Sequence, residues 1–577
     1  MQTFPETLLH HLTHTPDRVA VTLLFAREPD QPITYRQLMD GARGYATAFV
    51  QAGIRPGEVV VLILDHGPDL IFAFFGAVLH GAIPSILPYL TEKLDPEHYR
   101  KSLAALFDLT TPAAVLTAPA FAAEVDAARE ERAKPEILLT PMSQRVGEST
   151  SQPTNQPTNQ PITPSTDQPI PPSPFPLFSP SPSAIVLLQH SSGTTGLQKG
   201  VALSHEAVFY QLESYRKAIR LTDEDVIVSW LPLYHDMGLI AGFLMPILLG
   251  VPLVLMSPFD WVRAPARLLQ AVSQYRGTLT WLPNFAYNFC AQKIRERQLE
   301  GVDLSSWRAV INCSEPMHVE SHRMFAEKFA PFGLRASALG TCYAMAENVF
   351  AVTQGGIDAP PTEDVIGLED FVGKRRARAV PEGGSAVTML SAGRPLENVE
   401  VRVLDDDRNP LPERFIGELA LRSNCMLTGY YHRPDATAQA FHEGWYLTGD
   451  LGYLADGEVY ITGRKKDLII VGGKNVYPQD LEYVANEVPG VYPGRVVAFG
   501  VYDEQAGTEE VVLVAETDAT DEAERQRIAD DIRVRVTKGT AVALRVVELV
   551  PREWLIKTSS GKIARGANRE RFLKREV

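Results

Sequence analysis

The chain has 577 residues, 45% hydrophobic and 22% charged, which is a globular composition with enough length for more than one hydrophobic core. Its 70 acidic and 55 basic residues give a formal net charge of −15, which argues against a role in nucleic-acid binding. The cysteines Cys290, Cys313, Cys342 and Cys425 lie far apart and lack metal-ligand spacing, so neither a zinc site nor a disulfide framework is expected. The first residues also lack the basic start and apolar stretch of a signal peptide, and we expect a cytoplasmic protein.

Residues 1–140 alternate helical stretches with short apolar runs such as EVVVLIL (58–64) and AAVLTA (113–118). This alternation predicts a layered α/β sheet. Residues 142–183 are mainly Ser, Thr, Pro, Gln and Asn, and a segment of this composition cannot bury enough apolar surface to fold. We therefore interpret residues 142–183 as a low-complexity insertion or linker.

Residues 237–259 carry no charge and are numerous enough to span a bilayer. Pro246, Gly250 and Pro252 interrupt the stretch, however, and the LVLM run after the second proline is typical of a short buried strand. We predict a buried helix, a turn and a strand here, and no transmembrane segment.

The α/β pattern continues from Ala184 to about Arg464, where the charged segment GRKKD begins the last part of the chain. That last part has strand-like runs, VVAFGVY, EVVLVAE and LRVVELV, and a helical pattern over residues 522–535. We expect a first domain at 1–465, which contains the insertion, and a small second domain at 466–577 that moves as a unit.

The segment HSSGTTGLQKGVALSH follows an apolar strand at 185–189. Its hydroxyl side chains alternate with glycines, so backbone N–H groups and hydroxyls can converge on phosphate oxygens with no Cβ in the way. The spacing is not the Gly-x-x-x-x-Gly-Lys-Ser/Thr of the Walker loop, which argues against ordinary P-loop chemistry. The predicted phosphate-binding residues are Ser191, Ser192, Gly193, Thr194, Thr195, Gly196 and Lys199.

SSGTTGLQKGV resembles the phosphate loop of the adenylate-forming (AMP-binding) superfamily, which includes acyl-CoA synthetases, fatty acyl–AMP ligases, luciferases and the adenylation domains of peptide synthetases. Five further segments resemble the motifs of that superfamily and occur in the same order. They are WLPLYHDMGLI (230–240), TCYAMAE (341–347), YLTGDLGYL (446–454), GRKKD (463–467) and IKTSSGKIAR (556–565). The resemblance implies a large multi-subdomain N-terminal α/β domain and a small mobile α+β C-terminal domain, with ATP and Mg²⁺ bound between them.

The resemblance also implies the metal and nucleotide contacts. Glu347 would bind Mg²⁺ between the phosphates, a role suited to a hard carboxylate oxygen, and Thr195 would be a second metal contact. Tyr343 would pack near the nucleotide, and Ala344 stands where the superfamily has glycine. The alternative for Glu347 is a structural acid at the start of a helix.

Four more roles follow from matching positions. Asp450 and Arg464 would hold the ribose hydroxyls, and Asp467 would be the hinge of the small domain. Lys562 matches the catalytic lysine, whose charge reaches the α-phosphate and the carboxylate as pyrophosphate leaves. His235 would lie near the reacting carboxylate, although a packed core histidine is the alternative.

The implied reaction has two steps: a carboxylate and ATP give acyl-AMP and pyrophosphate, and a thiol then takes the acyl group. The pair Tyr234–His235 replaces the aspartate that holds the substrate ammonium in amino-acid-activating relatives, which argues against activation of an amino acid. A resemblance to fatty acyl–AMP ligases, described below, implies a fatty acid as the substrate. A scaffold without turnover would lack Lys562, Glu347, Asp450 or Arg464, all of which are present. A kinase would release ADP instead of AMP and pyrophosphate.

Two branches of the superfamily differ in the thiol that accepts the acyl group. PNFAYNFC (283–290), NCSEP (312–316), KNVYPQDLE (474–482) and an extra segment at 353–390 resemble fatty acyl–AMP ligases, which load an acyl carrier protein. The Gly472–Gly473 pair instead resembles long-chain acyl-CoA synthetases, which use coenzyme A. We expect the phosphopantetheine thiol of a carrier protein, supplied in trans by a separate protein or a polyketide or peptide synthase, with coenzyme A as the alternative.

Overall fold

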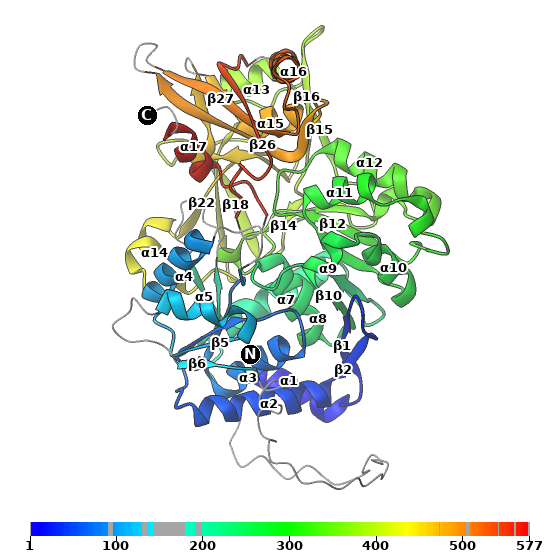
Figure 1. Cartoon of the computed structure of the whole chain (residues 1–577), viewed down its shortest axis with the longest axis vertical. Coiled ribbons are helices and arrows are strands. Elements are labelled where there is room, and N and C mark those ends of the chain that lie inside the picture. Colours follow the sequence, from blue (N-terminus) through cyan, green and yellow to red (C-terminus); the bar gives the residue numbers. More distant parts are fainter. Residues whose placement is uncertain are drawn as a thin grey trace.

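The computed structural model describes residues 2–90, 96–129, 137–141, 179–190, 199–471, 474–503, 508–540, 542–558 and 561–574. In Figure 1 most of the first 460 residues form the lower and middle parts of the molecule, and the C-terminal residues lie at the top together with residues 363–390. The lower part contains two sheets of mostly parallel strands with helices around them.

The larger sheet has seven strands, and all neighbours pair in parallel except the edge strand β2. Its central strands are buried on both faces, as their continuous apolar sequences predict. The order is β13 (Leu339–Cys342), β12 (Ala309–Cys313), β11 (Leu279–Leu282), β9 (Ile227–Ser229), β10 (Leu253–Met256), β1 (Val19–Leu24) and β2 (Gln31–Thr34).

The smaller sheet is parallel and comes from the first part of the chain, in the order β4 (Ile83–Ile86), β3 (Val59–Ile63), β5 (Ala114–Thr117) and β6 (Ile137–Leu139). Residues 1–140 therefore do not form one sheet by themselves. β1 pairs with β10 far along the chain, Val21 opposite Leu253. Local pattern predicts that β1 is a strand but does not reveal its partner.

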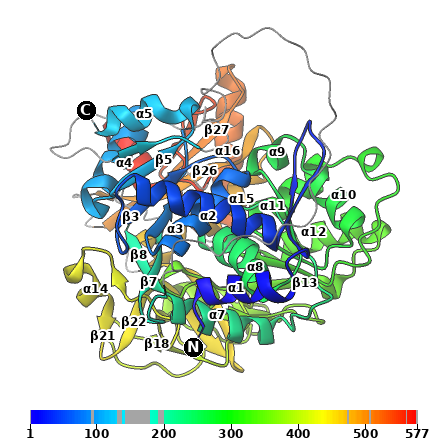
Figure 2. The ribbon, with the colours of Figure 1, turned by 90° about the horizontal axis from the view of Figure 1, so that it is seen from below.

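Helices α1 (Phe4–His14), α2 (Tyr35–Gln51) and α3 (Pro68–His80) form the bottom layer of Figure 1 and lie in front in Figure 2. α2 and α3 approach closely at Gly76, where a Cβ would lie 2.5 Å from the Cβ of Tyr45. Eight further helices lie around the sheets. They are α4 (Pro96–Thr110), α5 (Pro119–Arg129), α7 (His205–Ala218), α9 (Pro258–Arg263), α10 (Ala266–Tyr275), α11 (Asn284–Lys293), α12 (Val319–Phe329) and α14 (Pro434–Ala440).

The uncharged stretch at 237–259 is buried in this part of the chain. It forms a π-helix, η1 (Met237–Leu244), then α8 (Met245–Leu249) and the strand β10, as expected apart from the π-helical geometry. Gly250, with φ of 77°, ends α8 in the left-handed conformation. Among the described residues, none of the helices combines the length and the apolar character that crossing a membrane requires.

Two antiparallel sheets follow later in the chain. One consists of β7 (Ile185–His190), β8 (Gly200–Ser204) and β20 (Gly429–Tyr430). The other contains β18 (Val399–Leu404), β19 (Gly417–Ser423), β22 (Trp445–Ala455), β21 (Phe441–His442) and β23 (Glu458–Arg464). The extra segment folds as β14 (Thr353–Gln354), the hairpin β15 (Glu363–Gly367) and β16 (Ala386–Leu390), and α13 (Leu368–Lys374) between these two strands.

The residues from Ile469 onward build hydrophobic clusters of their own around a three-stranded sheet. Its strands are β26 (Val491–Asp503), β27 (Thr508–Thr517) and β28 (Val546–Val550), with the short hairpin β24 (Ile469–Val471) and β25 (Lys474–Val476) beside them. Helices α15 (Pro478–Asn486) and α16 (Glu522–Thr540) cover one face, and α17 (Arg565–Leu573) covers the other through Phe572. We call residues 469–574 the C-terminal unit.

Candidate active site

Asp450 and Arg464 face each other across the β22–β23 hairpin, where they are register partners. Nε of Arg464 lies 3.1 Å from Oδ1 of Asp450, and the hydroxyl of Tyr343 donates a hydrogen bond of 2.6 Å to Oδ2. The Asp450 charge is the largest cause that raises the pKa of Arg464. Asp450 is nearly buried, so this cluster offers a fixed anion and a fixed cation to a ligand with hydroxyl groups.

Glu347 lies in the single 3₁₀ turn Ala346–Asn348, so it is not at the start of an α-helix. Its Oε1 accepts a hydrogen bond of 2.9 Å from the hydroxyl of Tyr430, and that hydroxyl lies 3.0 Å from the hydroxyl of Tyr446. Burial raises the pKa of Glu347, and the charge of Asp236 adds to the effect. A buried carboxylate in this position gains stability from a cation beside it.

The residues present fit a nucleotide-bound Mg²⁺ better than a cage made of protein ligands. No group of three or more His, Cys, Asp or Glu side chains that could hold a metal ion occurs within the described residues. Mg²⁺ bound with ATP takes one or two protein carboxylates and fills its remaining positions with phosphate oxygens and water. Glu347 is suitably placed to be such a carboxylate, and Thr195 lies outside the described residues.

The charge of Lys562, in the C-terminal unit, acts on two residues of the WLPLYHDMGLI segment. Burial and, second, the Lys562 charge lower the pKa of His235 to about 3, so this imidazole is neutral at pH 7. Burial raises the pKa of Asp236, and the Lys562 charge opposes that rise. Nε2 of His235 is buried and has no hydrogen-bond partner among the described residues, so the ring could receive a bond from a ligand.

Asp236 is a residue of this site that the sequence did not single out. Its Oδ1 accepts a hydrogen bond of 2.8 Å from the N–H of Met237 and caps η1. It contributes to the electrostatic environment of Glu347 as well as that of Lys562. The sequence does contain a signal for Asp236, because it stands beside His235 in the same segment. Its closeness to Lys562, however, depends on the fold.

A tight hairpin carries Lys562. The N–H of Thr558 donates to the carbonyl of Lys562 at 2.8 Å, and Gly561 has φ of 83°, which favours glycine. Asn568 at the start of α17 closes the hairpin: its side chain accepts from the N–H of Ile556 at 2.8 Å and donates to the Ile556 carbonyl at 2.9 Å. These bonds join the two described sides of the hairpin, at residues 556–558 and 561–568.

The phosphate loop connects β7 and β8, which pair as antiparallel strands with His190 opposite Gly200. Ser191, Ser192, Gly193, Thr194, Thr195 and Gly196 lie outside the described residues, so their roles stay predictions. Lys199 is described, and its Nζ lies 4.4 Å from the ring centroid of Tyr430. Lys199 therefore lies over the ring of the tyrosine whose hydroxyl binds Glu347.

Asp467 ends the 3₁₀ turn Lys465–Asp467, directly after β23 and before β24. Its Oδ2 lies 2.8 Å from Nη1 of Arg565, at the start of α17. The predicted hinge residue thus lies between the N-terminal sheets and the C-terminal unit.

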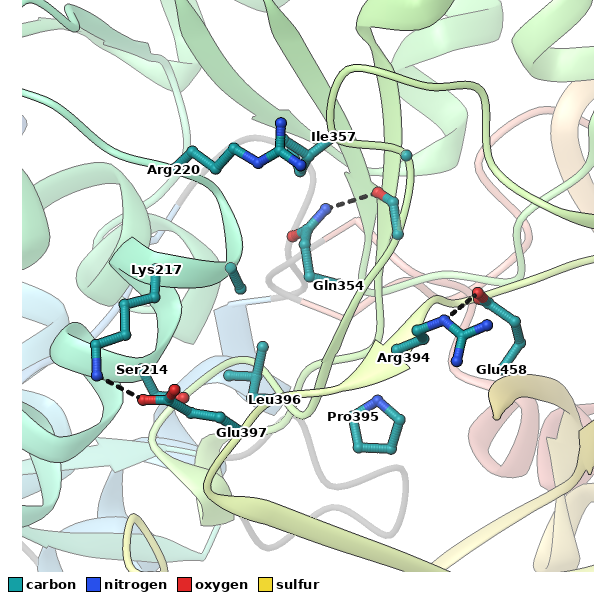
Figure 3. Close-up of a pocket in the computed structure, with 13 residues that line it drawn as sticks. Ser214, Lys217, Arg220, Gln354, Ile357, Arg394, Pro395, Leu396, Glu397 and Glu458 are labelled. Carbon is teal, nitrogen blue, oxygen red and sulfur yellow. Dashed lines mark hydrogen bonds and ion pairs between the residues drawn. The ribbon is translucent and has the colours of Figure 1, made fainter. Parts of the chain in front are cut away.

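A cavity of about 600 Å³ lies apart from these residues, between the end of α7 and the pair formed by β14 and β17 (Arg394–Pro395) (Figure 3). None of the predicted site residues lines it. Its cations are already paired: Lys217 with Glu397 at 2.7 Å and Arg394 with Glu458 at 3.1 Å. The site of the sequence motifs is therefore not this cavity.

Residues 8–431 match the family model of the AMP-binding enzymes. The chain belongs to this family. One relative is a medium-chain-fatty-acid–[acyl-carrier-protein] ligase, JamA of Moorena producens, with 30% identity over 94% of this chain and 90% of the relative. Another is a long-chain-fatty-acid–AMP ligase, FadD32 of Mycobacterium marinum, with 31% identity over 91% of this chain and 86% of the relative.

Solved structures of fatty acyl-adenylate ligases superpose on this chain over nearly its whole length. One from studies of fatty acyl-adenylate ligases of E. coli and L. pneumophila superposes with a TM-score of 0.88 at 26% identity, covering 100% of this chain and 98% of that one. A fatty acyl-adenylate ligase of L. pneumophila in complex with acyl adenylate and pyrophosphate superposes with a TM-score of 0.73 at 27% identity, over 99% and 96% of the two chains. The predictions of the adenylate-forming fold and of an ATP-dependent, AMP-forming ligase are confirmed.

Proposed function

We propose that this member of the AMP-binding family activates a fatty acid as acyl-AMP, with release of pyrophosphate, and passes the acyl group to the phosphopantetheine thiol of an acyl carrier protein. The observation that carries the proposal is that the charge of Lys562 acts on His235 and Asp236, and the charge of Asp236 acts on Glu347. A cation and a neutral imidazole near the reacting carboxylate, with a carboxylate suited to Mg²⁺, are the groups that adenylation requires.

Four residues of the site would each have a role in the adenylation step. Asp450 accepts hydrogen bonds from the ribose hydroxyls, and the ion pair with Arg464 orients that carboxylate. Lys562 balances the negative charge that collects as the carboxylate approaches the α-phosphate, because it is a point charge on a flexible stem. Glu347 would hold Mg²⁺, which neutralises the leaving pyrophosphate.

Nε2 of His235 would donate one hydrogen bond to the reacting carboxylate. The pKa of about 3 keeps the ring uncharged, so it does not compete with Lys562 for the anionic groups. Asp236 is influenced by the Lys562 charge, acts on Glu347 in turn, and caps the start of η1.

The extra segment at 353–390 supports the choice of a carrier protein as acceptor. Phe371 of α13 and Tyr477 of the C-terminal unit have ring centroids 5.3 Å apart and belong to one buried cluster. A contact of this kind ties the C-terminal unit to a feature that this chain shares with fatty acyl–AMP ligases. The Gly472–Gly473 pair, which favoured coenzyme A, lies outside the described residues.

Mass spectrometry of the enzyme with ATP, Mg²⁺ and dodecanoic acid tests the proposal. We expect dodecanoyl-AMP that coenzyme A does not convert and that a phosphopantetheinylated carrier protein, free or part of a polyketide or peptide synthase, does convert. Rapid formation of dodecanoyl-CoA would instead identify a long-chain acyl-CoA synthetase.

A further inference from the structure

His318 and Tyr483 stack on each other although they belong to different parts of the molecule. His318 precedes α12 of the N-terminal part, and Tyr483 lies on α15 of the C-terminal unit. Their ring centroids are 4.1 Å apart and the ring planes differ by 19°. The two rings therefore form a direct contact across the boundary that follows Asp467.

Both rings are carried by well-fixed backbone. The N–H of His318 donates to Oδ1 of Asn284 at 3.3 Å, and the same oxygen accepts from Nδ2 of Asn312 on β12 at 2.9 Å. Tyr483 lies on a helix whose residues Leu481 and Ala485 are buried in the core of the C-terminal unit. Because neither ring moves independently of its own part, the stack depends on how the two parts are oriented.

The charges around the pair favour an uncharged contact. Burial lowers the pKa of His318 to about 4, against an opposing effect of Glu320, so the imidazole is neutral at pH 7. Burial is also the largest cause that raises the pKa of Tyr483, to which Glu320, Glu487 and, in the opposite sense, Arg323 contribute. A stack of two neutral, partly buried rings should favour the orientation that contains it over one that lacks it by a factor of about three to ten in population.

We infer that His318 and Tyr483 are positioning residues that hold the C-terminal unit in the orientation in which Lys562 reaches His235 and Asp236. The inference rests on the proposed function, since it assigns the stack to the adenylation step. The hairpin of Lys562 and the helix of Tyr483 are parts of the same unit, so a turn of that unit about Asp467 separates His318 from Tyr483 as it withdraws the lysine. The stack thus favours acyl-AMP formation over the orientation used for thiol transfer.

The test separates the two half-reactions in His318→Ala, Tyr483→Ala and the double variant. Single-turnover formation of dodecanoyl-AMP should fall about three- to tenfold in each single variant and no further in the double, because one shared contact is lost. Transfer from preformed dodecanoyl-AMP to a carrier-protein thiol should stay at the wild-type rate or rise. Additive losses in the double variant, or equal losses in both half-reactions, would overturn the inference.

Aromatic replacements and a distant tyrosine are the controls. Tyr483→Phe and His318→Phe keep a stacked ring and should restore the adenylation rate. Tyr502→Ala, which removes a 61% exposed ring from β26 of the same unit, should change neither half-reaction. These variants separate a loss of stacking from a loss of folding.

A second measurement does not depend on the substrate. Trypsin cleavage after Arg464, Lys465 or Lys466 in the connecting segment should be faster in the two alanine variants than in wild type and Tyr502→Ala, because the C-terminal unit is less firmly held. Equal cleavage rates would refute the stack as a holding contact. Wild-type enzyme that forms no dodecanoyl-AMP would count against the proposed function, while the proteolysis result would still decide the inference.

Discussion

The guanidinium of Arg565 pairs with Asp467, with Nη1 2.8 Å from Oδ2. Nη2 of the same group lies 2.7 Å from Oε1 of Glu482, and Nε donates to the carbonyl of Ala498 at 2.8 Å. Arg565 follows Lys562 by three positions, so one side chain joins the lysine hairpin, the connecting segment and the core of the C-terminal unit.

Replacing Arg565 by Met should therefore destabilise the C-terminal unit and lower the adenylation rate. Asp467 and Glu482 would lose their shared cation while mostly buried, and removing one member of such a pair costs about 3 kcal/mol. Thermal unfolding and acyl-AMP formation measure the two effects. Arg565→Lys should recover only part of each, because a lysine cannot bind two carboxylates through a planar fork. Full activity in Arg565→Met would contradict the link between the connecting segment and Lys562.

Lys562→Ala should lower acyl-AMP formation by at least about a hundredfold, since the charge that balances the approaching anions is lost. Thiol transfer from preformed acyl-AMP should remain, because the lysine acts only in the first step. Quenched-flow mass spectrometry follows each step separately. The exposed Lys538 on α16 offers a matched control, and its replacement by alanine should leave both rates unchanged. Loss of both steps in Lys562→Ala would argue against separate orientations for the two half-reactions.

Glu347→Gln should raise the Mg²⁺ concentration needed for half-maximal adenylation by about tenfold or more, because an amide keeps the shape of the side chain but not its charge. The hydrogen bond from Tyr430 can persist in this variant, so the fold should be retained. A Mg²⁺ titration at fixed ATP gives the answer. Glu400→Gln, which alters an exposed carboxylate paired with Arg422, should have no effect. An unchanged Mg²⁺ requirement in Glu347→Gln would remove Glu347 from the metal site.

The free energy of unfolding should fall as the pH drops from 6.5 towards 4. Burial lowers the pKa of five histidines to about 4: His66, His190, His205, His318 and His322. Between the unfolded value of 6.5 and the folded value of about 4, the unfolded chain binds protons that the folded chain does not, so acid favours unfolding.

His322 tests this dependence, because its Nε2 lies 3.0 Å from Nδ2 of Asn312 and must act there as a hydrogen-bond acceptor. In His322→Gln the acceptor can be kept but the group no longer titrates, so the loss of stability on acidification should be smaller than in wild type. Chemical denaturation at several pH values measures the slope. His14→Gln, at an exposed position, should leave the slope unchanged. An equal slope in His322→Gln would show that this histidine does not contribute.

The motifs pointed to residues several of which the structure places close together. Asp450, Arg464, Tyr343 and Glu347 were expected near the nucleotide, and the structure brings the first three into direct contact. Their spacing did not indicate that Asp450 and Arg464 are opposite each other on one hairpin. The roles of these residues stay predictions.

Features that depend on distant pairing could not be predicted. β1 belongs to the larger sheet because of Leu253–Met256, and no local pattern near β1 carries that information. Asp236 and Lys562 are far apart in the chain, as are His318 and Tyr483, and each pair meets only through the orientation of the C-terminal unit. The residues of a short segment determine whether it forms a helix or a strand. Which other segments it packs against depends on the burial of apolar surface over the whole molecule.

All four cysteines of the sequence, Cys290, Cys313, Cys342 and Cys425, are buried and unpaired. Burial also raises the pKa of Cys290, Cys342 and Cys425, so little of each is the reactive thiolate. A maleimide dye should therefore label native enzyme slowly. The natural thiols would therefore not need to be removed before labelling. Two cysteines introduced on the surface, one on each side of Asp467, could carry a donor and an acceptor fluorophore. Energy transfer between them in single molecules would then follow the orientation of the C-terminal unit during turnover.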